Sequence, residues 1–162
     1  MAESTGHPTE ESKALAAALG RIPSGLFVLS IRHGEHETAM LASWVQQCSF
    51  DPPLVSVAVN ARRWWLEWLT DGASISLSIL GEGEKQLLAH FGMGFEKDQF
   101  AFEGIDVERT ADHPPTLRAA HAVLTGRVRS VHPAGDHRLV VAAIENGRVQ
   151  HDGRPAVHVR RS

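Results

Sequence analysis

An arginine pair, Arg62 and Arg63, directly follows a short apolar segment that ends at Asn60. Guanidinium groups form charge-assisted and often bidentate hydrogen bonds with phosphate oxygens. The tryptophans and leucines of residues 64–69 recur at helical spacing, so the pattern predicts a helix that starts at the arginine pair. Because a helix N-terminus also attracts anions, the pair is a candidate phosphate site. Two solvated surface arginines are the alternative interpretation.

Polar residues interrupt the β-like stretch 37–50. Ser43, Gln46 and Gln47 could direct polar atoms toward a planar ligand, since small-molecule sites are mostly apolar with a few placed polar groups. The Gln pair could equally mark the end of a strand. Trp44 fits the core or an interface as readily as a ligand platform. His137 follows Gly135 and Asp136 at a predicted turn, where such residues often serve the turn alone.

Several kinds of chemistry have no matching motif in the sequence. It contains no HExxH, no pair of CxxC motifs, no Walker loop and no GxGxxG after a strand. We therefore expect no metal site, no P-loop chemistry and no Rossmann nucleotide site. The net charge of −3 gives no general attraction to nucleic acid or to an anionic membrane.

Length and composition predict a single globular domain. The chain has 162 residues, of which 43% are hydrophobic and 22% charged. Its one cysteine, Cys48, cannot form an internal disulfide and is expected to be a small buried residue in a reducing compartment. No apolar run approaches the roughly 20 residues that span a bilayer, and no signal-peptide pattern opens the chain. These features favour the cytoplasm.

The coarse pattern is one of many strands and few helices. Residues 1–11 are polar and predict a disordered leader, so the domain would cover residues 12–162. Short helices are expected at 12–20, capped by Ser12, and at 83–92. The predicted strands are 25–33, 37–50, 54–60, 73–80, 120–132, 137–151 and 156–161, the fourth alternating and half-buried. Without βαβ alternation, they indicate a Greek-key or barrel topology.

Taken in order, several segments resemble the flavin reductase-like, FMN-binding split-barrel family. They are TAMLASWVQQCSFDPP, VAVNARR, ISLSIL followed by KQLLAHFG, LTGRV and GDH, and they span about residues 18–159. The stretch ALGRIPSGLFVLSIRHGEHETAMLASWVQQCSFDPP and the final AVHVRR are most similar to the flavin reductase-like domain at the end of diflavin flavoproteins. The resemblance implies a mainly β, six-stranded antiparallel split barrel with Greek-key order and a few short peripheral helices. It also implies a homodimer with flavin in two interface grooves.

The same resemblance assigns site residues by position. Next to the flavin ring it places Leu41, Ala42, Ser43 and Trp44, and near the ribityl chain and phosphate Gln46 and Gln47. The phosphate loop would be Asn60, Ala61, Arg62 and Arg63. The groove would be lined by Ser78, Ile79 and Leu80, with His90 and Phe91 near the flavin. His137 would be the catalytic residue, placing the nicotinamide, and Trp64 and Trp65 would pack a helix or the dimer interface.

The implied activity is hydride transfer from NAD(P)H to flavin, with FMN as the expected flavin and FAD as an option. Reduced flavin or electrons would then pass to a monooxygenase or another acceptor protein, and neither nucleic acid nor membrane is an expected partner. Ala142 stands where relatives carry Gly and would narrow the nicotinamide site. This departure favours an alternative, an FMN-holding electron-transfer module with little NAD(P)H activity. A third hypothesis is a split barrel that binds another ligand, such as haem, or none.

Overall fold

A seven-stranded antiparallel sheet forms most of the computed structural model, which describes residues 7–161. Its order is β3-β2-β6-β9-β10-β5-β4. The strands are β2 (Phe27–His33), β3 (His36–Ala42), β4 (Val45–Ser49), β5 (Leu54–Asn60), β6 (Ser74–Ile79), β9 (Ala122–Ala134) and β10 (His137–Val149). The expected mainly β split-barrel class is confirmed, and the main sheet has seven strands where the resemblance implied six.

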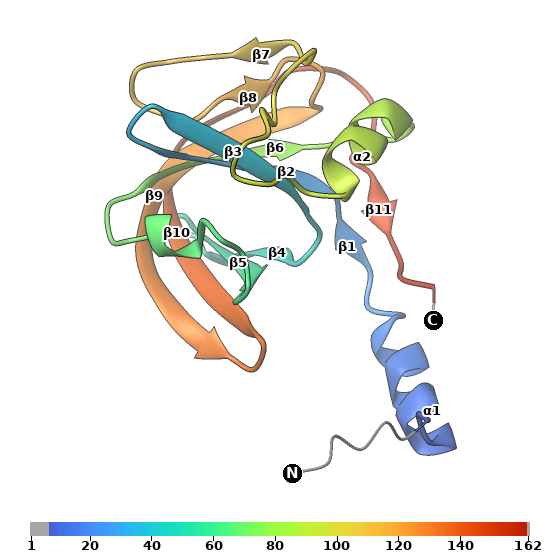
Figure 1. The fold of residues 1–162 in the computed structure, drawn as a ribbon. Helices are drawn as coiled ribbons and strands as arrows, with labels where there is room; N and C mark the ends of the chain where they lie inside the picture. The colour runs from blue at the N-terminus through green and yellow to red at the C-terminus, as the bar shows by residue number, and fades with distance from the viewer. Residues whose placement is uncertain (1–6, 162) are drawn as a thin grey trace.

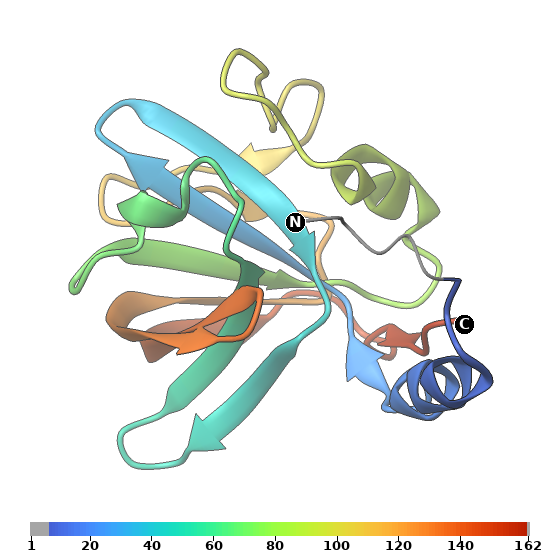
Figure 2. The ribbon, with the colours of Figure 1, turned by 60° about the horizontal axis from the view of Figure 1, so that its bottom comes forward.

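The two ends of this sheet are covalent neighbours. Strands β3 and β4 lie at opposite ends of the hydrogen-bonded order, yet only Ser43 and Trp44 separate them in the chain. Because the three peptide links from Ala42 to Val45 span at most about 11 Å, the sheet has to curl until its ends approach each other (Figures 1 and 2). We call this Ser43–Trp44 link the seam. The N–H of Ala58 donates to the carbonyl of Trp44 at 3.0 Å and so ties the seam to β5.

Several small elements lie around the curled sheet, and helix α1 (Glu10–Leu19) extends away from it without a buried residue (Figure 1). The others are β1 (Ser24–Gly25), the 3₁₀ turn η1 (Leu66–Trp68), α2 (Lys85–Gly92), β7 (Val107–Glu108), β8 (Thr116–Leu117) and β11 (Val157–His158). Strand β1 pairs with β11, and β7 pairs with β8. Within residues 7–161, no helix has the length and apolar character that crossing a membrane requires.

Helix α1 begins two residues before its predicted cap. Thr9 is the N-cap, because its hydroxyl accepts a hydrogen bond from the N–H of Ser12 at 3.2 Å. Glu10 and Glu11 occupy the first turn, where carboxylates favour the helix dipole. The expected cap at Ser12 is therefore wrong, and residues 10–11 of the expected leader are helical. Residues 1–6 of that leader lie outside the described residues.

Two hydrophobic clusters bury both faces of the central strand β6. The first lies inside the curl and includes Leu77 and Trp65, while the second lies beneath α2 and β8 and includes Leu80 and Leu117. The expectation of a half-buried β6 is wrong because its serines also point into a covered layer. There Ser76 donates to the carbonyl of Pro114 at 2.7 Å, which satisfies the buried hydroxyl.

The predicted helix after the arginine pair is also wrong. Only the three-residue turn η1 forms, and its bonds run three residues back, as from the N–H of Trp68 to the carbonyl of Trp65. Trp65 is 2% exposed and fills the first core cluster. Trp64 instead donates its indole N–H to the carbonyl of Phe95 at 2.9 Å. Contrary to expectation, Cys48 is exposed.

Candidate functional site

A hollow of about 230 Å³ lies at the seam, where residues from four segments meet. We call it the seam hollow. It is lined by Met40, Leu41, Ala42, Ser43, Trp44, Ala58, Asn60, Arg63 and His137. All of these except Met40 and Ala58 are residues that the sequence singled out. Residues nearly one hundred positions apart thus reach one cavity because β5 pairs with β10.

The pairing register explains how His137 reaches the hollow. His137, the first residue of β10, lies opposite Asn60, the last residue of β5. Its ring packs against the half-exposed Trp44, with the two ring centroids 4.9 Å apart. The imidazole of His137 and the indole of Trp44 therefore lie next to each other along the hollow.

Asp136 holds the imidazole of His137 in place. Its Oδ1 lies 2.6 Å from Nδ1 of His137. This hydrogen bond, followed by the attraction of His137 and more weakly of Arg62, holds the pKa of Asp136 below its ordinary value. When Nδ1 donates to the carboxylate, Nε2 of a neutral ring is left as the acceptor. The pair thus fixes both the orientation and the tautomer of His137.

In the expected phosphate loop, residues 60–63, backbone N–H groups already donate to acceptors within the protein. The N–H of Arg62 donates to Oδ1 of Asn60 at 2.9 Å, and the N–H of Arg63 donates to the carbonyl of Asn60 at 3.1 Å. The N–H of Ala61 donates to the carbonyl of Asp136 at 3.0 Å. The expected helix N-terminus is absent from this loop. Anion binding here would depend on the two guanidinium groups instead.

Both guanidinium groups are without an acidic partner in the part of the chain that the structure describes. No carboxylate comes within ion-pair distance of Arg62 or Arg63. Gly94 leaves space for Arg63, since a Cβ at that position would lie 2.9 Å from Nη1 of the arginine. The loop after α2 thus packs closely against Arg63, which lines the hollow.

A larger groove lies on the other side of Trp44. This outer groove has a volume of about 670 Å³ and shares Ser43, Trp44 and Ala58 with the seam hollow. The remaining lining residues are Ile22, Pro23, Ser24, Gly25, Phe27, Val45, Gln46, Ser56, Ile79, Leu139, Pro155, Ala156 and Val157. Most of them are apolar. The seam residues therefore separate two cavities, the polar and cationic seam hollow and the apolar outer groove.

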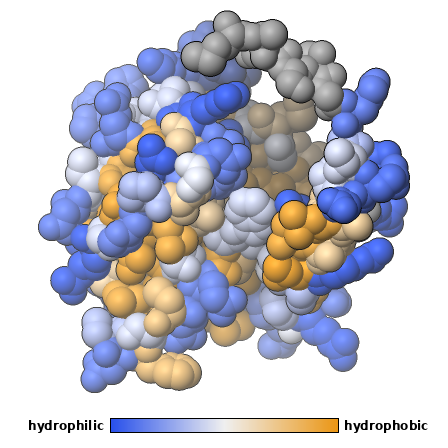
Figure 3. All heavy atoms as spheres, turned by 90° about the horizontal axis from the view of Figure 1, so that it is seen from below, coloured by the Kyte–Doolittle hydropathy of each residue, from blue (hydrophilic) through white to orange (hydrophobic). Residues whose placement is uncertain are grey.

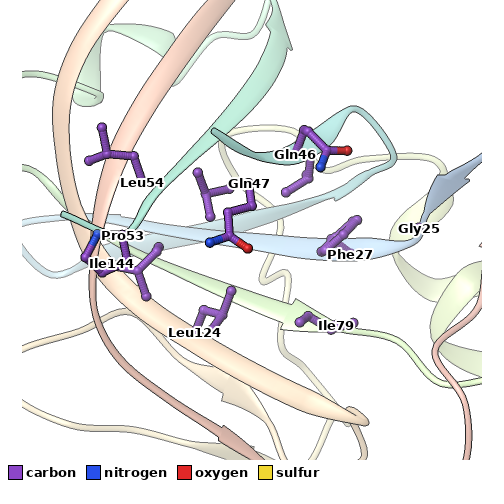
Figure 4. Close-up of a pocket in the computed structure, with 11 residues that line it drawn as sticks. Gly25, Phe27, Gln46, Gln47, Pro53, Leu54, Ile79, Leu124 and Ile144 are labelled. Carbon is purple, nitrogen blue, oxygen red and sulfur yellow. The ribbon is translucent and has the colours of Figure 1, made fainter. Parts of the chain in front are cut away.

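The glutamine pair lies apart from the arginine pair. Gln46 and Gln47 line a third hollow of about 440 Å³ at the end of the curl, together with apolar side chains such as Phe27 and Leu124 (Figure 4). Gln47 also donates its amide N–H to the carbonyl of Ser49 at 3.2 Å. Ile79 lines this hollow and the outer groove. Neither glutamine lines the seam hollow, but Gln46 also lines the outer groove together with Ser43 and Trp44.

Four of the expected ligand contacts belong to the second core cluster or to its edge. Ser78, Leu80 and Phe91 are almost completely buried, and Ser78 accepts a hydrogen bond from the N–H of Leu117 at 3.0 Å. His90 is half-buried, with Nε2 2.7 Å from the carbonyl of Ala101. None of the four lines the three hollows described above. Packing and hydrogen bonding already occupy their side chains, and the assignment of these four residues to the flavin groove stays a prediction.

Two residues change their significance in the structure. Ala142 is 0% exposed and packs in the first core cluster, away from the seam hollow. It therefore does not narrow the cavity at which a nicotinamide was expected. Asp136, which the sequence treated only as part of a turn, is a further candidate site residue because it bonds the ring of His137. Its position directly before His137 was the available signal.

Three comparisons with known proteins agree with this geometry. The family model described as "Flavin reductase like domain" matches residues 19–162. The reductase component of 4-hydroxyphenylacetate 3-monooxygenase from Thermus thermophilus is 35% identical over 149 residues, which cover 92% of this chain and 93% of that protein. Diflavin flavoprotein A 1 from Synechocystis is 38% identical over 91% of this chain, but the match covers only 26% of that longer protein.

Solved structures show the same fold at lower identity. The NADH:FAD oxidoreductase SgcE6 of Streptomyces globisporus C-1027 superposes with a TM-score of 0.82 at 19% identity, covering 98% of this chain and 95% of that one. The flavin reductase of styrene monooxygenase from Pseudomonas putida S12 gives a TM-score of 0.74 at 24% identity, with coverage of 90% and 91%. These similarities concern the fold alone.

Proposed function

Because the chain belongs to the flavin reductase-like family, we propose that it is an NAD(P)H:flavin oxidoreductase that serves a separate acceptor such as a monooxygenase. The observation that carries the proposal is the seam hollow, which gathers Trp44, Arg63 and His137 at one cavity. A bound flavin would supply the chemistry by accepting a hydride from a reduced nicotinamide. The protein's task is then to bind and orient.

The residues at the seam fit a flavin by their chemistry. The unpaired guanidinium groups of Arg62 and Arg63 suit a phosphate, and the indole of Trp44 with the hydroxyl of Ser43 suits a flat ring with polar edges. One arginine pair matches the single phosphate of FMN, which we propose as the flavin. The hollow of about 230 Å³ is smaller than the roughly 300 Å³ at which ligand pockets begin. Further walls are therefore needed to enclose the ligand.

We propose that a second copy of the chain supplies these walls in a homodimer. Large apolar side chains are exposed along and beside the outer groove, and hydrophobic surface is visible on this side of the molecule (Figure 3). They include Leu19, Ile22, Trp44, Leu139 and Val157. Burying such a surface would favour association.

We also propose that the protein works in a reducing compartment, the cytoplasm, which suits its single free cysteine.

His137 would act by position. Its imidazole is held by Asp136 and packed against Trp44, so it presents Nε2 at the rim of the hollow in one orientation. That fixed group would help to place a nicotinamide next to the flavin, since reactive groups gain most from being held in the correct geometry.

A second candidate function is an electron-transfer module with little NAD(P)H activity. The observation in its favour is the similarity to diflavin flavoproteins, of whose length this chain spans about a quarter. The substitution at Ala142 no longer supports it, because that residue is buried in the core.

The test begins with purified protein loaded with FMN. We expect the protein fraction to keep its flavin absorbance after gel filtration. This absorbance should bleach within seconds when the loaded protein is mixed anaerobically with NADH or NADPH. Retained flavin that bleaches slowly or not at all would favour the electron-transfer module. Protein that cannot be loaded with FMN or FAD would overturn both functions.

A further inference from the structure

A second group of arginines lies beyond the outer groove, in a hollow of about 470 Å³. It is lined by Arg21, Val159, Arg160 and Arg161. Arg21 follows α1 and the other three follow β11, so the pairing of β1 with β11 brings the two segments together. Figures 1 and 2 show α1 beside the C-terminal segment. The contact is close, since a Cβ on Gly20 would lie 3.2 Å from the carbonyl oxygen of Arg160.

These three arginines are free of acidic partners within residues 7–161. No carboxylate of the described residues forms an ion pair with Arg21, Arg160 or Arg161. Like charges gathered at one hollow repel one another unless an anion lies between them. Guanidinium groups at such a place match the geometry of phosphate oxygens. The hollow therefore has the charge and the donor groups for a phosphate-bearing ligand.

Arg160 connects this hollow to the seam. Its guanidinium carbon lies 5.3 Å from the centroid of the Trp44 ring, a cation–π contact. The same indole packs against His137 on the seam-hollow side. Val157 lines the outer groove and Val159 the cationic hollow, so the two cavities follow one another along the C-terminal segment. An apolar groove thus leads from Trp44 to three arginines.

We propose that Arg21, Arg160 and Arg161 bind the diphosphate of a dinucleotide that extends from the seam along the outer groove. The inference rests on the proposed function, for which Arg62 and Arg63 already account for one phosphate. A ligand with a flat ring at one end and a diphosphate at the other matches an apolar groove with a cationic end. Both the nicotinamide dinucleotide and flavin adenine dinucleotide have this chemistry. Because the two phosphates of FAD are joined directly, FAD would take this position only with its flavin phosphate away from Arg62 and Arg63, whereas the nicotinamide dinucleotide fits beside a flavin phosphate held there.

The first experiment measures binding of inorganic pyrophosphate by calorimetry, without flavin. The starting protein is Arg62→Ala/Arg63→Ala, in which the other phosphate site is removed. We expect about one pyrophosphate per chain, and a Kd at least tenfold higher when Arg21→Ala/Arg160→Ala is added. The matched control is Arg129→Ala/Arg154→Ala, which removes two exposed arginines that line neither cavity.

The second experiment identifies the source of the diphosphate in protein with Arg62 and Arg63 intact. If the ligand is the nicotinamide dinucleotide, Arg21→Ala/Arg160→Ala raises the Kd of NADH about tenfold. Retention of FMN and of FAD then stays the same as in the protein without this substitution. If it is the flavin, FAD is released about tenfold more readily while FMN retention is unchanged. Either result supports the proposal.

Two results would overturn it. One is unchanged pyrophosphate binding in the Arg21→Ala/Arg160→Ala protein, and the other is an equal loss in the control pair. If unchanged binding comes with a changed oligomeric state, the arginines belong to a contact between copies. Circular dichroism verifies that each variant is folded. Because pyrophosphate binding needs no flavin, failure of this proposal remains distinguishable from failure of the proposed function.

Discussion

Arginines on two sides of the molecule have opposite surroundings. Away from the seam, Arg109 lies 2.6 Å from Glu37, Arg148 lies 2.7 Å from Glu108, and Arg118 and Arg127 also meet carboxylates. At the seam and the neighbouring cationic hollow, five arginines meet none among the described residues. We call the first group the paired arginines and the second the seam arginines, Arg21, Arg62, Arg63, Arg160 and Arg161.

Scarcity of acidic residues does not explain the difference. The chain carries 19 Asp and Glu residues against 16 Lys and Arg, so carboxylates are in excess. The paired arginines face acidic residues across strands and loops, as expected of a solvated surface. The seam arginines keep their charge available. Arg129 and Arg154 also lack a carboxylate partner among residues 7–161. The seam arginines differ from them because four of the five line the seam hollow or the cationic hollow.

The strongest test of this comparison removes two arginines from each group. Arg62→Ala/Arg63→Ala should weaken FMN retention about 100-fold, because two charge-assisted hydrogen bonds contribute about 3 kcal/mol. Arg118→Ala/Arg148→Ala makes the same change in net charge and should leave retention within about twofold. Equilibrium dialysis against FMN measures both. Equal losses in the two proteins would mean that only net charge matters, and no loss in the first would place the phosphate elsewhere.

A subtler change disturbs the seam arginines without removing a charge. Gly94 has a φ of 74°, and an added Cβ would lie 2.9 Å from Nη1 of Arg63. Gly94→Ala should therefore cost about 1–2 kcal/mol of stability through backbone strain and also displace the guanidinium. We expect a lower urea midpoint together with weaker FMN retention. Gly104→Ala is the control, since Gly104 also has positive φ but no neighbour within 4 Å of the added Cβ. It should lose stability and keep FMN.

For the free energy of unfolding, we expect the paired arginines to matter more than the seam arginines. Arg118→Ala/Arg148→Ala removes the contacts to Glu108 and should lower the free energy of unfolding by about 1 kcal/mol, because these ion pairs are half-exposed. Arg62→Ala/Arg63→Ala should change it by less than about 0.5 kcal/mol in protein without flavin. Urea unfolding followed by tryptophan fluorescence measures the difference. A larger loss in the second protein would give the seam arginines a structural role.

The sequence predicted the framework and part of the site. Strands 27–33, 54–60 and 137–149 follow from apolar runs bounded by turns, and the predicted site residues Trp44, Arg63 and His137 line one hollow. The wrong predictions for strand β6 and for the helix after Arg63 share a cause. Ser78 alternates with apolar neighbours as a surface residue would, but residues 114–117 cover that face and bond its hydroxyl. The missing helix after Arg63 reflects Trp65, whose burial in the core outweighs helical spacing.

The smallest expected effect concerns the carboxylate that does lie at the seam. Its hydrogen bond with His137 holds the pKa of Asp136 below the ordinary value. Any stabilisation by this pair is therefore present above the ordinary pKa of about 4 and is lost as the pH falls through the lower folded pKa. His137→Ala should move the pKa of Asp136 back up, which NMR titration of the carboxyl carbon detects. An unchanged midpoint would mean that the hydrogen bond does not form in solution.

The seam also has a consequence for how copies of this protein meet in solution. A sheet whose ends do not join leaves two strands with unpaired backbone groups, and such edges invite intermolecular pairing and aggregation. Strand β4 is only five residues long, and its register with β5 shifts between Gln47 and Ser49, leaving Cys48 in a bulge. Short length, polar side chains and a bulge are the features that discourage edge-to-edge growth. The glutamine pair that first resembled a ligand contact thus also protects the open edge of the barrel.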